Sequence, residues 1–595
     1  MERIASWLGS RGAPWLVVIV GLALAAPALT ADFTADDHLH RVLSRSDPGI
    51  DGLHARPLDL FVFANGDAAD TTRLRDAGAY PWWVDPSLRL SFLRPISSAT
   101  HAVDHALWPD SSTAQLAHNL AWLALSLVVT WLFYRRFIPP RWIAVLALAL
   151  YAFDDARGPV VGWIANRNAL VALVLAVPAL LLHDRWRRDG WAPGRWLAPL
   201  VFAVSLGAGE SSIAIVAYLV AHALWLDRGT WKDRLLALAP YVLIIIVWRV
   251  IYAHLGYGVV GSGIYVDPGA DPAAFLAAAG TRIPALLTGQ LSLPWSDIAS
   301  LYPVLGISCV MLLVALATIA IVGLACARLL RRDPVSRFFA TGMLLAAVPI
   351  ASTFPADRLL GFVGLGAMGL IAQLIAAALR HRNQLGDGRL RRTGGVLVAI
   401  TMVLVHLVLS PPMLVLRSRG MIAVGQVIDR ADAGIPSDPG VADKTVIIVT
   451  TPSDALAGYV PIMRASRNQP RPAHLLWLAT GNVPLTLERV DATSVRMTAP
   501  DGLLHYEIDQ MMRSPRAHPF AVGDQVALPT VTLIVEAITA DGRPSRVLAR
   551  FAVALEDASL LWRRWEGTTY VPYRPLTIGA SEAFAPIDLL KLLAN

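Results

Sequence analysis

Charge is scarce in this sequence, and lysine is almost missing from it. Only 16% of the 595 residues are charged and 55% are hydrophobic, so the chain is far more apolar than an average soluble protein. Lysine occurs only as Lys232, Lys444 and Lys591, and the net charge of +7 is therefore carried by arginine. No basic run with interleaved aromatic residues is present, which argues against nucleic acid as a partner. The composition predicts an integral membrane protein.

Cysteine is equally scarce. Cys309 and Cys326 are the only two, and both fall in one apolar segment. Seventeen positions on a helix rise roughly 25 Å, which is beyond the reach of a disulfide. We interpret both as lipid-facing or core residues, and they carry no information about redox compartment.

Hydropathy predicts eleven membrane-spanning helices of about 20 residues or somewhat fewer. Their expected ranges are 13–31, 114–134, 142–155, 159–182, 196–208, 211–226, 235–253, 303–327, 336–352, 359–379 and 394–413. The first follows Arg3 and Arg11, as a cleaved signal peptide would. We favour an uncleaved anchor because the apolar stretch is long and many similar segments follow.

Arginine clusters orient these helices. If residues 196–226 form a hairpin, the clusters at 135–141, 185–195, 228–234, 328–337 and 380–392 all fall on one side. The positive-inside rule makes that side cytoplasmic. We therefore expect a multi-pass protein of a bacterial inner membrane, with a cytoplasmic N-terminus and a periplasmic C-terminal domain.

The remaining chain is predicted to lie outside the membrane. Residues 1–413 would form the transmembrane domain, with exterior loops 32–113 and 254–302; the second loop has the composition of a mobile segment. Pro95 is expected to start a helix that runs to about Trp108. Residues 414–595 alternate β-branched runs with turns, as at Val531–Val535 and Ala540–Arg543. They predict a soluble, mainly β (α+β) domain, with a helix near 454–465.

Two adjacent carboxylates, Asp36 and Asp37, follow the first span directly. They could be solvated loop residues. Other ionisable or polar residues recur near the same predicted face, where burial is costly unless they pair or line a wet cavity. These are His118, Asn119, Arg167, Glu210, Asp357 and Arg358. A structural salt bridge is the alternative for each, but their number favours a shared exterior cavity.

The order of these motifs resembles GT-C-type glycosyltransferases. It is similar in particular to polyprenyl- or dolichyl-phosphate-mannose-dependent O-mannosyltransferases and their bacterial relatives. The matching segments are Phe33-Thr34-Ala35-Asp36-Asp37, Leu93-Arg94-Pro95-Ile96, Ala117-His118-Asn119-Leu120, Val161-Gly162-Trp163-Ile164 with Arg167, Gly209-Glu210, and Asp357-Arg358-Leu359-Leu360. The chain departs from that pattern at Gly209, where lysine is frequent, and at Asp357, where glutamate is frequent. It also carries no tetratricopeptide repeats.

The resemblance implies transfer of a sugar from a polyprenyl-phosphate carrier to an acceptor hydroxyl of a glycan, lipid or protein. Asp36 or Asp37 would be the catalytic base, which such an attack requires. Arg94, Arg167 and Arg358 are candidates for the phosphate, and His118, Asn119, Glu210 and Asp357 for substrate contacts. A lipid or glycan transporter or flippase, or a non-catalytic scaffold, remains the alternative.

No cofactor is expected, although a divalent metal is an alternative. His101 and His105 lie four residues apart with Asp104 beside them, and His38 and His40 lie close to Asp37. Histidines at this spacing can bind a metal from one helical face. Such histidines are more often part of an amphipathic surface, so we predict no metal site.

Overall fold

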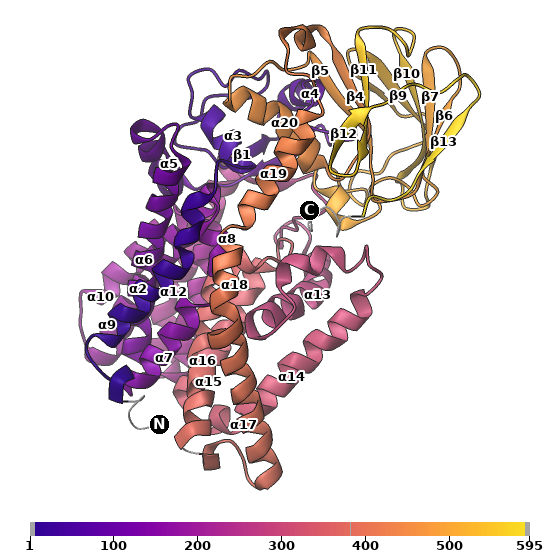
Figure 1. Cartoon of the computed structure of the whole chain (residues 1–595). Coiled ribbons are helices and arrows are strands. Elements are labelled where there is room, and N and C mark those ends of the chain that lie inside the picture. The colour runs from indigo at the N-terminus through magenta and orange to yellow at the C-terminus, as the bar shows by residue number, and fades with distance from the viewer. Residues whose placement is uncertain (1–5, 381, 589–595) are drawn as a thin grey trace. The chain divides into compact units, whose positions relative to one another are not determined.

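The computed structural model describes residues 6–380 and 382–588, which form two compact units. The first unit consists of Met1–Asp32, Phe92–Leu255 and Asp267–Met421, and is helical (Figure 1). The second consists of Phe33–Ser91, Gly256–Val266 and Ile422–Asn595. The expected division at residue 413 therefore differs from the observed one, because parts of both predicted exterior loops fold with the C-terminal domain.

The first unit contains seven helical segments that are long and apolar enough to cross a membrane. Four shorter apolar helices accompany them, so all eleven expected spans are helical. The long segments are α2 (Ala13–Ala25) with the 3₁₀ helix η1 (Ala26–Thr30), α6 (Ser112–Phe137), η2 (Ile164–Arg167) with α9 (Asn168–Asp189), α12 (Trp231–His254), α14 (Ser308–Arg332), α16 (Gly361–Arg380), and the run of α17 (Arg389–Val403), the π-helix η7 (Leu404–Leu409), α18 (Ser410–Arg417) and α19 (Gly420–Ala433). The shorter ones are α7 (Arg141–Ala152), α10 (Gly194–Leu206), η3 (Glu210–Ala214) with α11 (Ile215–Trp225), and α15 (Pro334–Ile350).

Helix α16 lies in the interior of this unit, and 89% of its most apolar stretch is buried. Glycines on α16 and on its neighbour α15 allow close approach of the helices packed against them. A Cβ on Gly366 would lie 2.5 Å from the Phe339 carbonyl oxygen of α15, and one on Gly342 would lie 2.3 Å from the Tyr218 ring of α11. Small residues at helix contacts are how membrane helices gain van der Waals packing.

The prediction of a mobile loop over residues 254–302 is wrong for much of that range. Residues Pro272–Leu291 form a 20-residue helix, α13. Asp271 caps it by accepting a hydrogen bond from the Ala274 N–H at 2.9 Å, and Pro272 occupies its first turn, where proline is tolerated. The alanine-rich stretch that looked like a loop is therefore a capped helix with buried residues such as Phe275 and Arg282.

The other elements near the ends of the spans are short. Helix α5 (Pro95–Leu107) confirms the predicted helix that starts at Pro95. The remaining ones are α8 (Arg157–Val161), η4 (Ser296–Leu301), η5 (Asp357–Leu359) and η6 (Arg382–Gln384). Asp104, Asp297, Asp357 and Arg358, which are described below, belong to these elements.

The second unit is built on three sheets, which confirms a mainly β domain with helices. A small sheet pairs β1 (Val62–Asn65), β2 (Arg89–Ser91) and β3 (Gly258–Val260), so it joins both former loops. A six-stranded antiparallel sheet has the order β13-β6-β7-β10-β9-β8. Its strands are Ser581–Phe584, Leu485–Arg489, Ser494–Thr498, Pro544–Phe551, Val531–Ile538 and Gln525–Ala527 in that order.

The third sheet has the order β12-β11-β4-β5 (Thr569–Pro572, Leu560–Glu566, Thr445–Thr451 and His474–Thr480). Strands β11, β4 and β5 are parallel, and the helix α20 (Asp454–Ser466) connects β4 to β5. Strand β4 is buried along its whole length, as expected of a strand in a parallel sheet. The predicted helix near 454–465 is thus the crossover of a β-α-β motif.

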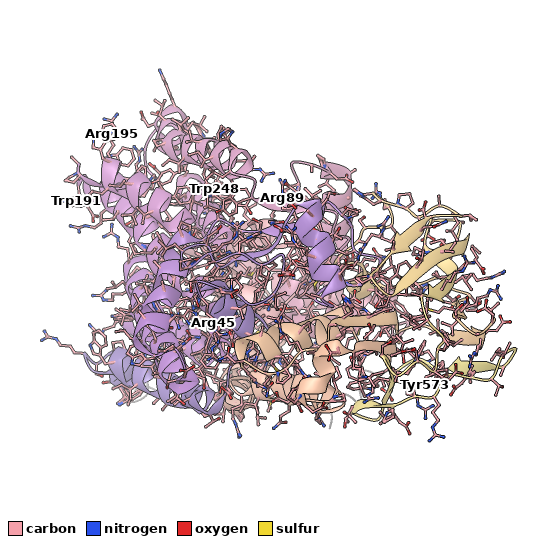
Figure 2. All side chains as sticks on the ribbon, turned by 90° about the horizontal axis from the view of Figure 1, so that it is seen from above. Arg45, Arg89, Trp191, Arg195, Trp248 and Tyr573 are labelled. Carbon is pink, nitrogen blue, oxygen red and sulfur yellow. The ribbon has the colours of Figure 1, made fainter. Side chains whose placement is uncertain are left out.

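Two further helices of this unit come from the first predicted loop: α3 (Asp36–Leu43) and α4 (Ala68–Asp76). Helix α3 packs against α20. Arg45 follows α3 and donates hydrogen bonds to the carbonyl oxygens of Ala465 and Ser466 at 2.9 and 2.5 Å; it is labelled in Figure 2. This contact ties the end of α3 to the end of α20, although more than 400 residues separate them in sequence.

The three chain segments that form the second unit constrain the membrane topology. Its three segments must lie on one side of a membrane because they form one folded unit. Six apolar helical segments separate the first junction, near residue 92, from the second at residue 255, and four separate the second from the third, near residue 421, if α13 is left out. Even numbers return the chain to the same side. The eleven expected spans satisfy this condition, and α13 as an additional full crossing would violate it.

Candidate functional site

Asp36 and Asp37 begin helix α3 in the second unit and have different surroundings. Asp37 is buried, and its Oδ2 accepts a hydrogen bond from the Thr34 N–H at 3.0 Å, which holds this carboxylate against the turn before the helix. Asp36 is half-buried, and its Oδ1 accepts a hydrogen bond from the Tyr459 hydroxyl of α20. Burial, together with the adjacent Asp36 charge, raises the pKa of Tyr459 well above its usual range, which keeps this hydroxyl a donor. Asp36 is therefore the more accessible carboxylate.

The residue before this helix has an unusual backbone. Ala35 has a φ of 52°, a left-handed conformation that L residues other than glycine rarely adopt. Strain of this kind persists only where the surroundings enforce it, and it occurs often at functional sites. Here it turns the chain so that Thr34 meets Asp37.

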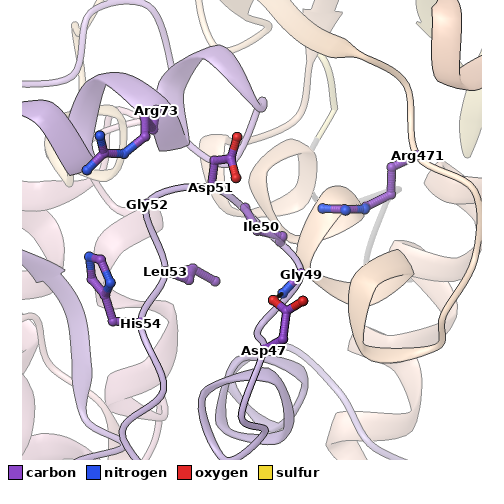
Figure 3. A pocket seen from close by; sticks show the side chains of 9 residues that line it. All are labelled: Asp47, Gly49, Ile50, Asp51, Gly52, Leu53, His54, Arg73 and Arg471. Atoms are coloured by element: carbon purple, nitrogen blue, oxygen red, sulfur yellow. Dashed lines mark hydrogen bonds between the residues drawn. The ribbon is translucent and has the colours of Figure 1, made fainter.

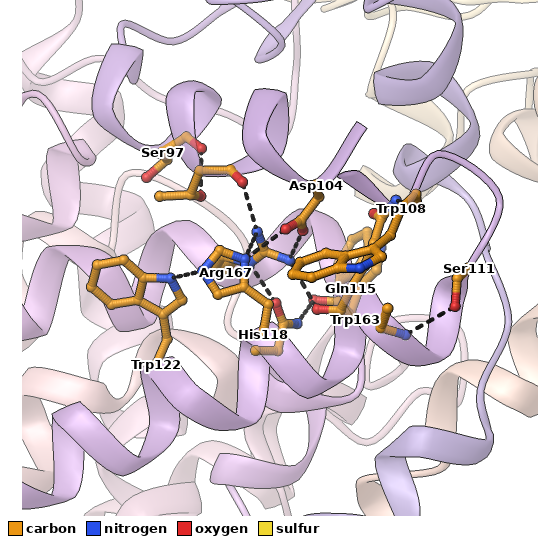
Figure 4. Close-up of polar contacts among 12 residues, drawn as sticks. Ser97, Asp104, Trp108, Ser111, Gln115, His118, Trp122, Trp163 and Arg167 are labelled. Carbon is orange, nitrogen blue, oxygen red and sulfur yellow. Dashed lines mark hydrogen bonds and ion pairs between the residues drawn. The ribbon is translucent and has the colours of Figure 1, made fainter. Parts of the chain in front are cut away.

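Arg167 lies at the centre of a buried polar cluster in the first unit (Figure 4). Its guanidinium pairs with Asp104 and donates to the Asn119 side-chain oxygen at 2.6 Å and to the carbonyl oxygens of Thr100 and Gln115 at 3.2 and 3.0 Å. Both the arginine and the aspartate side chains are fully buried. The cluster joins η2, α5 and α6, so it supports the structural alternative for Arg167.

His118 and Asn119 belong to the same cluster. The Trp122 indole donates to His118 Nε2 at 3.0 Å, so the ring proton is on Nδ1, which donates to Asp104 Oδ1 at 2.6 Å. The Asn119 amide donates to the Val161 and Trp163 carbonyl oxygens at 3.1 and 3.2 Å. Asp104, which the sequence placed beside a histidine pair, is thus an anchor for Arg167 and His118.

A second cluster in the first unit connects the residue before α5 with η3 and α12. Arg94, directly before α5, donates from Nε to Glu210 Oε2 at 2.8 Å, and the Tyr252 hydroxyl donates to Glu210 Oε1 at 3.3 Å. The Arg94 and Glu210 side chains retain 19% and 24% exposure, unlike the buried Arg167. The guanidinium also lies 4.7 Å from the Phe92 ring centroid. A partly exposed pair of this kind can exchange its partner for a ligand.

A third cluster surrounds Asp357 and contains residues that the sequence did not single out as a site. Arg417, at the end of α18, contacts three carboxylates at once: Asp155, Asp297 and Asp357. The distances to Asp155 and Asp357 are 2.6 and 2.7 Å. Asp357 is buried and also accepts from the Ser296 N–H at 2.8 Å. Arg417 thus joins carboxylates from three segments that are far apart in the sequence.

Arg358 differs from Arg94, Arg167 and Arg417, which pair with carboxylates, because its guanidinium contacts two aromatic rings. Its guanidinium carbon lies 4.8 Å from the Trp163 ring centroid and 5.4 Å from that of Phe354. Within residues 6–380 and 382–588, it has neither a hydrogen bond nor an ion pair to another side chain. Stacking orients the guanidinium plane and leaves its N–H groups available for an anion.

The seven predicted residues of the first unit thus fall into three clusters. His118, Asn119 and Arg167 share one; Arg94 and Glu210 share a second; Asp357 and Arg358 are neighbours in the third. The sequence-based prediction did not include Asp155, Asp297, Arg417 or Tyr459 among the site residues. Asp155 could have been included, because it lies in an Asp-Asp turn at the end of a predicted span. Arg417 resembles an ordinary flanking charge, and Asp297 and Tyr459 carry no signal.

The described residues contain no group of three or more histidine, cysteine, aspartate or glutamate side chains arranged to hold a metal. His38 Nδ1 is 2.6 Å from the Ser466 hydroxyl, and His40 packs edge-on against the Phe61 ring at 4.8 Å between centroids. Both imidazoles are buried. These contacts fasten α3 within the second unit.

Comparison with known proteins shows similarity at the level of structure. No protein-family model matches the chain, and no curated protein sequence matches it. The Archaeoglobus fulgidus oligosaccharyltransferase, crystallised with a tethered acceptor peptide, aligns over 80% of this chain with 12% identity and a TM-score of 0.41. ArnT from Cupriavidus metallidurans, bound to undecaprenyl phosphate, aligns over 79% with 14% identity and a TM-score of 0.33.

The two solved structures differ in how much of them the chain matches. The alignment covers 64% of the archaeal enzyme and 90% of ArnT, so the chain spans less than two thirds of the former.

Proposed function

We propose that this protein is a membrane glycosyltransferase that moves a sugar from a polyprenyl-phosphate carrier to an acceptor hydroxyl on the periplasmic face of a bacterial inner membrane. The single observation that carries the proposal is the aromatic environment of Arg358. A half-buried guanidinium stacked on Trp163 and Phe354, with its N–H groups unused by other side chains among the described residues, suits a lipid-linked phosphate. The motif resemblance and the membrane helices support the same class of donor.

Asp36 is the proposed catalytic base. In the reaction, the acceptor oxygen forms a bond to the anomeric carbon while the bond from that carbon to the phosphate oxygen breaks. The polyprenyl phosphate leaves with the bonding electron pair, and the acceptor proton passes to a carboxylate. Asp36 fits better than Asp37 because it is half-buried, whereas Asp37 is buried and accepts a hydrogen bond from the Thr34 N–H.

The remaining predicted residues take different roles in this proposal. Arg94 with Glu210, and Asp357 with Arg358, would contact substrate because those pairs include partly exposed side chains. Arg167, His118 and Asn119 would hold α5, α6 and η2 in place for them. No cofactor is included, and the acceptor is proposed only as a hydroxyl of a glycan, lipid or protein.

Label transfer tests this proposal. Purified full-length protein in lipid nanodiscs is incubated with radiolabelled polyprenyl-phosphate hexose and membrane extract as the acceptor source. We expect Asp36→Asn to reduce transfer by at least about 100-fold, the typical contribution of a general base. Asp501→Asn, an exposed aspartate of the same unit, is the matched control and should transfer at the wild-type rate.

Arg358→Gln should raise the KM for the carrier about tenfold or more, because a charge-assisted contact to phosphate is lost.

Equal transfer by wild type and Asp36→Asn would remove the Asp36 carboxylate from the mechanism. Absence of transfer by a folded wild-type protein with every acceptor would argue for the scaffold or transporter alternative.

A further inference from the structure

The second unit contains an open pocket of about 600 Å³ that none of the proposed transferase residues lines (Figure 3). Its walls come from the loop between α3 and β1, from α4, and from the connection between α20 and β5. The lining residues are Asp47, Gly49, Ile50, Asp51, Gly52, Leu53, His54, Arg73 and Arg471. The volume is in the range of small-molecule sites.

The loop that forms one wall has a defined backbone. Gly52 has a φ of +92°, and a Cβ on it would lie 2.8 Å from the Asp70 carbonyl oxygen of α4. Only glycine allows this close approach. The Leu53 N–H also donates to the Ile50 carbonyl oxygen at 3.1 Å, which closes a turn within the loop. The pocket wall is therefore pressed against α4 rather than detached from it.

A buried carboxylate behind this wall holds two basic side chains. Asp70 accepts from Arg73 at 2.5 Å, from His54 Nε2 at 2.8 Å and from the Asn65 amide at 2.6 Å. Burial tends to raise the pKa of Asp70, but these three hydrogen bonds outweigh it and keep the pKa below its ordinary value. Asp70 is thus ionised near neutral pH, and it positions His54 and Arg73 at the rim.

Arg471 differs from Arg73, which pairs with Asp70. Within the part of the chain that the structure describes, its half-buried guanidinium makes neither a hydrogen bond nor an ion pair within 4.0 Å. Burial lowers its pKa, and the charges of Asp51 and Asp47 across the pocket act in the opposite direction. An arginine stays protonated under these conditions. The pocket therefore presents the Arg471 guanidinium and the Asp47 and Asp51 carboxylates, which are close enough to interact but not paired, beside Arg73, which is paired with Asp70.

This lining selects against a strongly charged ligand. An anion would be attracted to Arg471 but repelled by Asp47 and Asp51, and a cation would meet the reverse. A sugar hydroxyl donates one hydrogen bond and accepts others, so it can satisfy a carboxylate and a guanidinium together. The apolar side chains of Ile50 and Leu53 suit the C–H face of a sugar ring.

We infer that this pocket binds an uncharged saccharide, with Arg471 and Asp51 as the principal contacts. The site lies within the second unit and is distinct from the proposed transferase residues. Its ligand is recognised by hydroxyl groups and not by a lipid phosphate. The inference goes beyond the proposed reaction, and direct binding tests it without any transfer step.

The experiment measures binding to full-length protein in nanodiscs by isothermal titration calorimetry and by saturation-transfer NMR. The probes are four neutral disaccharides: mannobiose, cellobiose, lactose and chitobiose. Glucuronate, glucosamine and glycylglycine represent an anion, a cation and a zwitterion. We expect at least one neutral disaccharide to bind more tightly than all three charged probes.

Substitutions then locate the binding site. Arg471→Gln and Asp51→Asn should each weaken the bound disaccharide about tenfold or more, since each removes a hydrogen bond to a charged group. Their matched controls are Arg550→Gln and Asp501→Asn, exposed residues of the same unit outside the pocket, which should leave the dissociation constant unchanged. Unchanged melting temperatures would show that the pocket variants fold.

Three results would overturn the inference. The first is that none of the four disaccharides binds wild-type protein. The second is binding that neither pocket substitution weakens. The third is tighter binding of glucuronate, glucosamine or glycylglycine than of every disaccharide, lost on the same substitutions, which would identify a site for a charged ligand. Loss of transferase activity in Asp36→Asn with disaccharide binding intact would separate this pocket from the proposed reaction.

Discussion

At the scale of single residues, the polar groups of the first unit differ in whether their hydrogen-bonding capacity is already used. Arg167 pairs with Asp104 and bonds Asn119 and two backbone carbonyl oxygens while being fully buried. Arg358 rests on two aromatic rings and stays half-buried. A buried, satisfied charge stabilises a particular packing, whereas a partly exposed one with spare N–H groups can bind a ligand.

Arg167→Gln therefore should destabilise the protein more than it alters substrate binding. Removing one partner of a buried ion pair leaves the other charge uncompensated and costs about 3–5 kcal/mol. Thermal unfolding in detergent would show a large fall in melting temperature. Arg358→Gln, which breaks no ion pair, should lower the melting temperature far less. Equal effects of the two substitutions would contradict the structural role of Arg167.

Asp454 makes a pH-dependent contribution to the second unit. Burial and the nearby Asp509 charge raise its pKa to about 8, although the Trp477 indole donates to it at 2.9 Å. Because the folded-state pKa is raised, its stabilising effect is complete below the unfolded pKa of about 4 and is lost as the pH rises to about 8. Across that window the unit should lose about 1.4 kcal/mol per pH unit.

Asp454→Asn tests this dependence because asparagine does not titrate. Amide hydrogen exchange of β4 and β5 in both proteins, compared at each pH from 5 to 8, measures their difference in stability. We expect that difference to change steadily with pH, with the wild type losing protection relative to the variant. A constant difference across the range would mean that Asp454 has an ordinary pKa.

At the scale of elements, the glycines of the helices have unequal importance. Gly366 of α16 lies where a Cβ would be 2.5 Å from the Phe339 carbonyl oxygen of α15. Backbone cannot move aside as a flexible side chain can. Gly323 of α14 also lies within a long apolar helix, but no atom lies within 4 Å of its would-be Cβ.

Gly366→Ala should therefore cost about 1–3 kcal/mol, because overpacking forces α15 and α16 apart. Gly323→Ala should be neutral or add up to about 1 kcal/mol, since alanine favours the helix. Unfolding of both variants in the same detergent provides the comparison. A loss of similar size in both would show that the close contact between α15 and α16 has no special weight.

At the scale of the whole molecule, the folded second unit and the arginine clusters lead to one proposed topology. Three separated segments form that unit, so all three share a side of the membrane. The arginines cluster at the opposite ends of the spans, as at Arg135 and Arg136 in the last turn of α6 and Arg331 and Arg332 in that of α14. On the positive-inside rule, we therefore propose that the second unit is periplasmic.

Cysteine labelling tests this orientation. In a background with both Cys309 and Cys326 changed to serine, Val522→Cys and Leu390→Cys place single thiols at exposed positions, 62% and 88% accessible. With only the outer membrane permeabilised, an impermeant maleimide should label Val522→Cys, whereas Leu390→Cys should react only after the inner membrane is opened. The reverse pattern would invert the proposed topology.

The sequence by itself determined the features that depend on local composition. Apolar runs of span length predicted the helical segments, because each membrane helix satisfies its own backbone hydrogen bonds. Alternating β-branched residues and the turn around Gly542 predicted β9 and β10, and Pro95 predicted the start of α5. The candidate residues near the predicted exterior face of the membrane could also be named from the sequence, because charged residues are rare beside apolar segments of span length.

Only the tertiary structure decided which of those residues meet. Arg167 finds Asp104 and Arg94 finds Glu210 across long sequence separations, and Arg417 reaches three carboxylates from three different segments. The tertiary structure also decided the contacts of the second unit, where α3 packs on α20 and the predicted loop 254–302 supplies β3. Such pairings follow from packing between distant segments, whose free energy depends on all the elements together and leaves no local signal in the sequence.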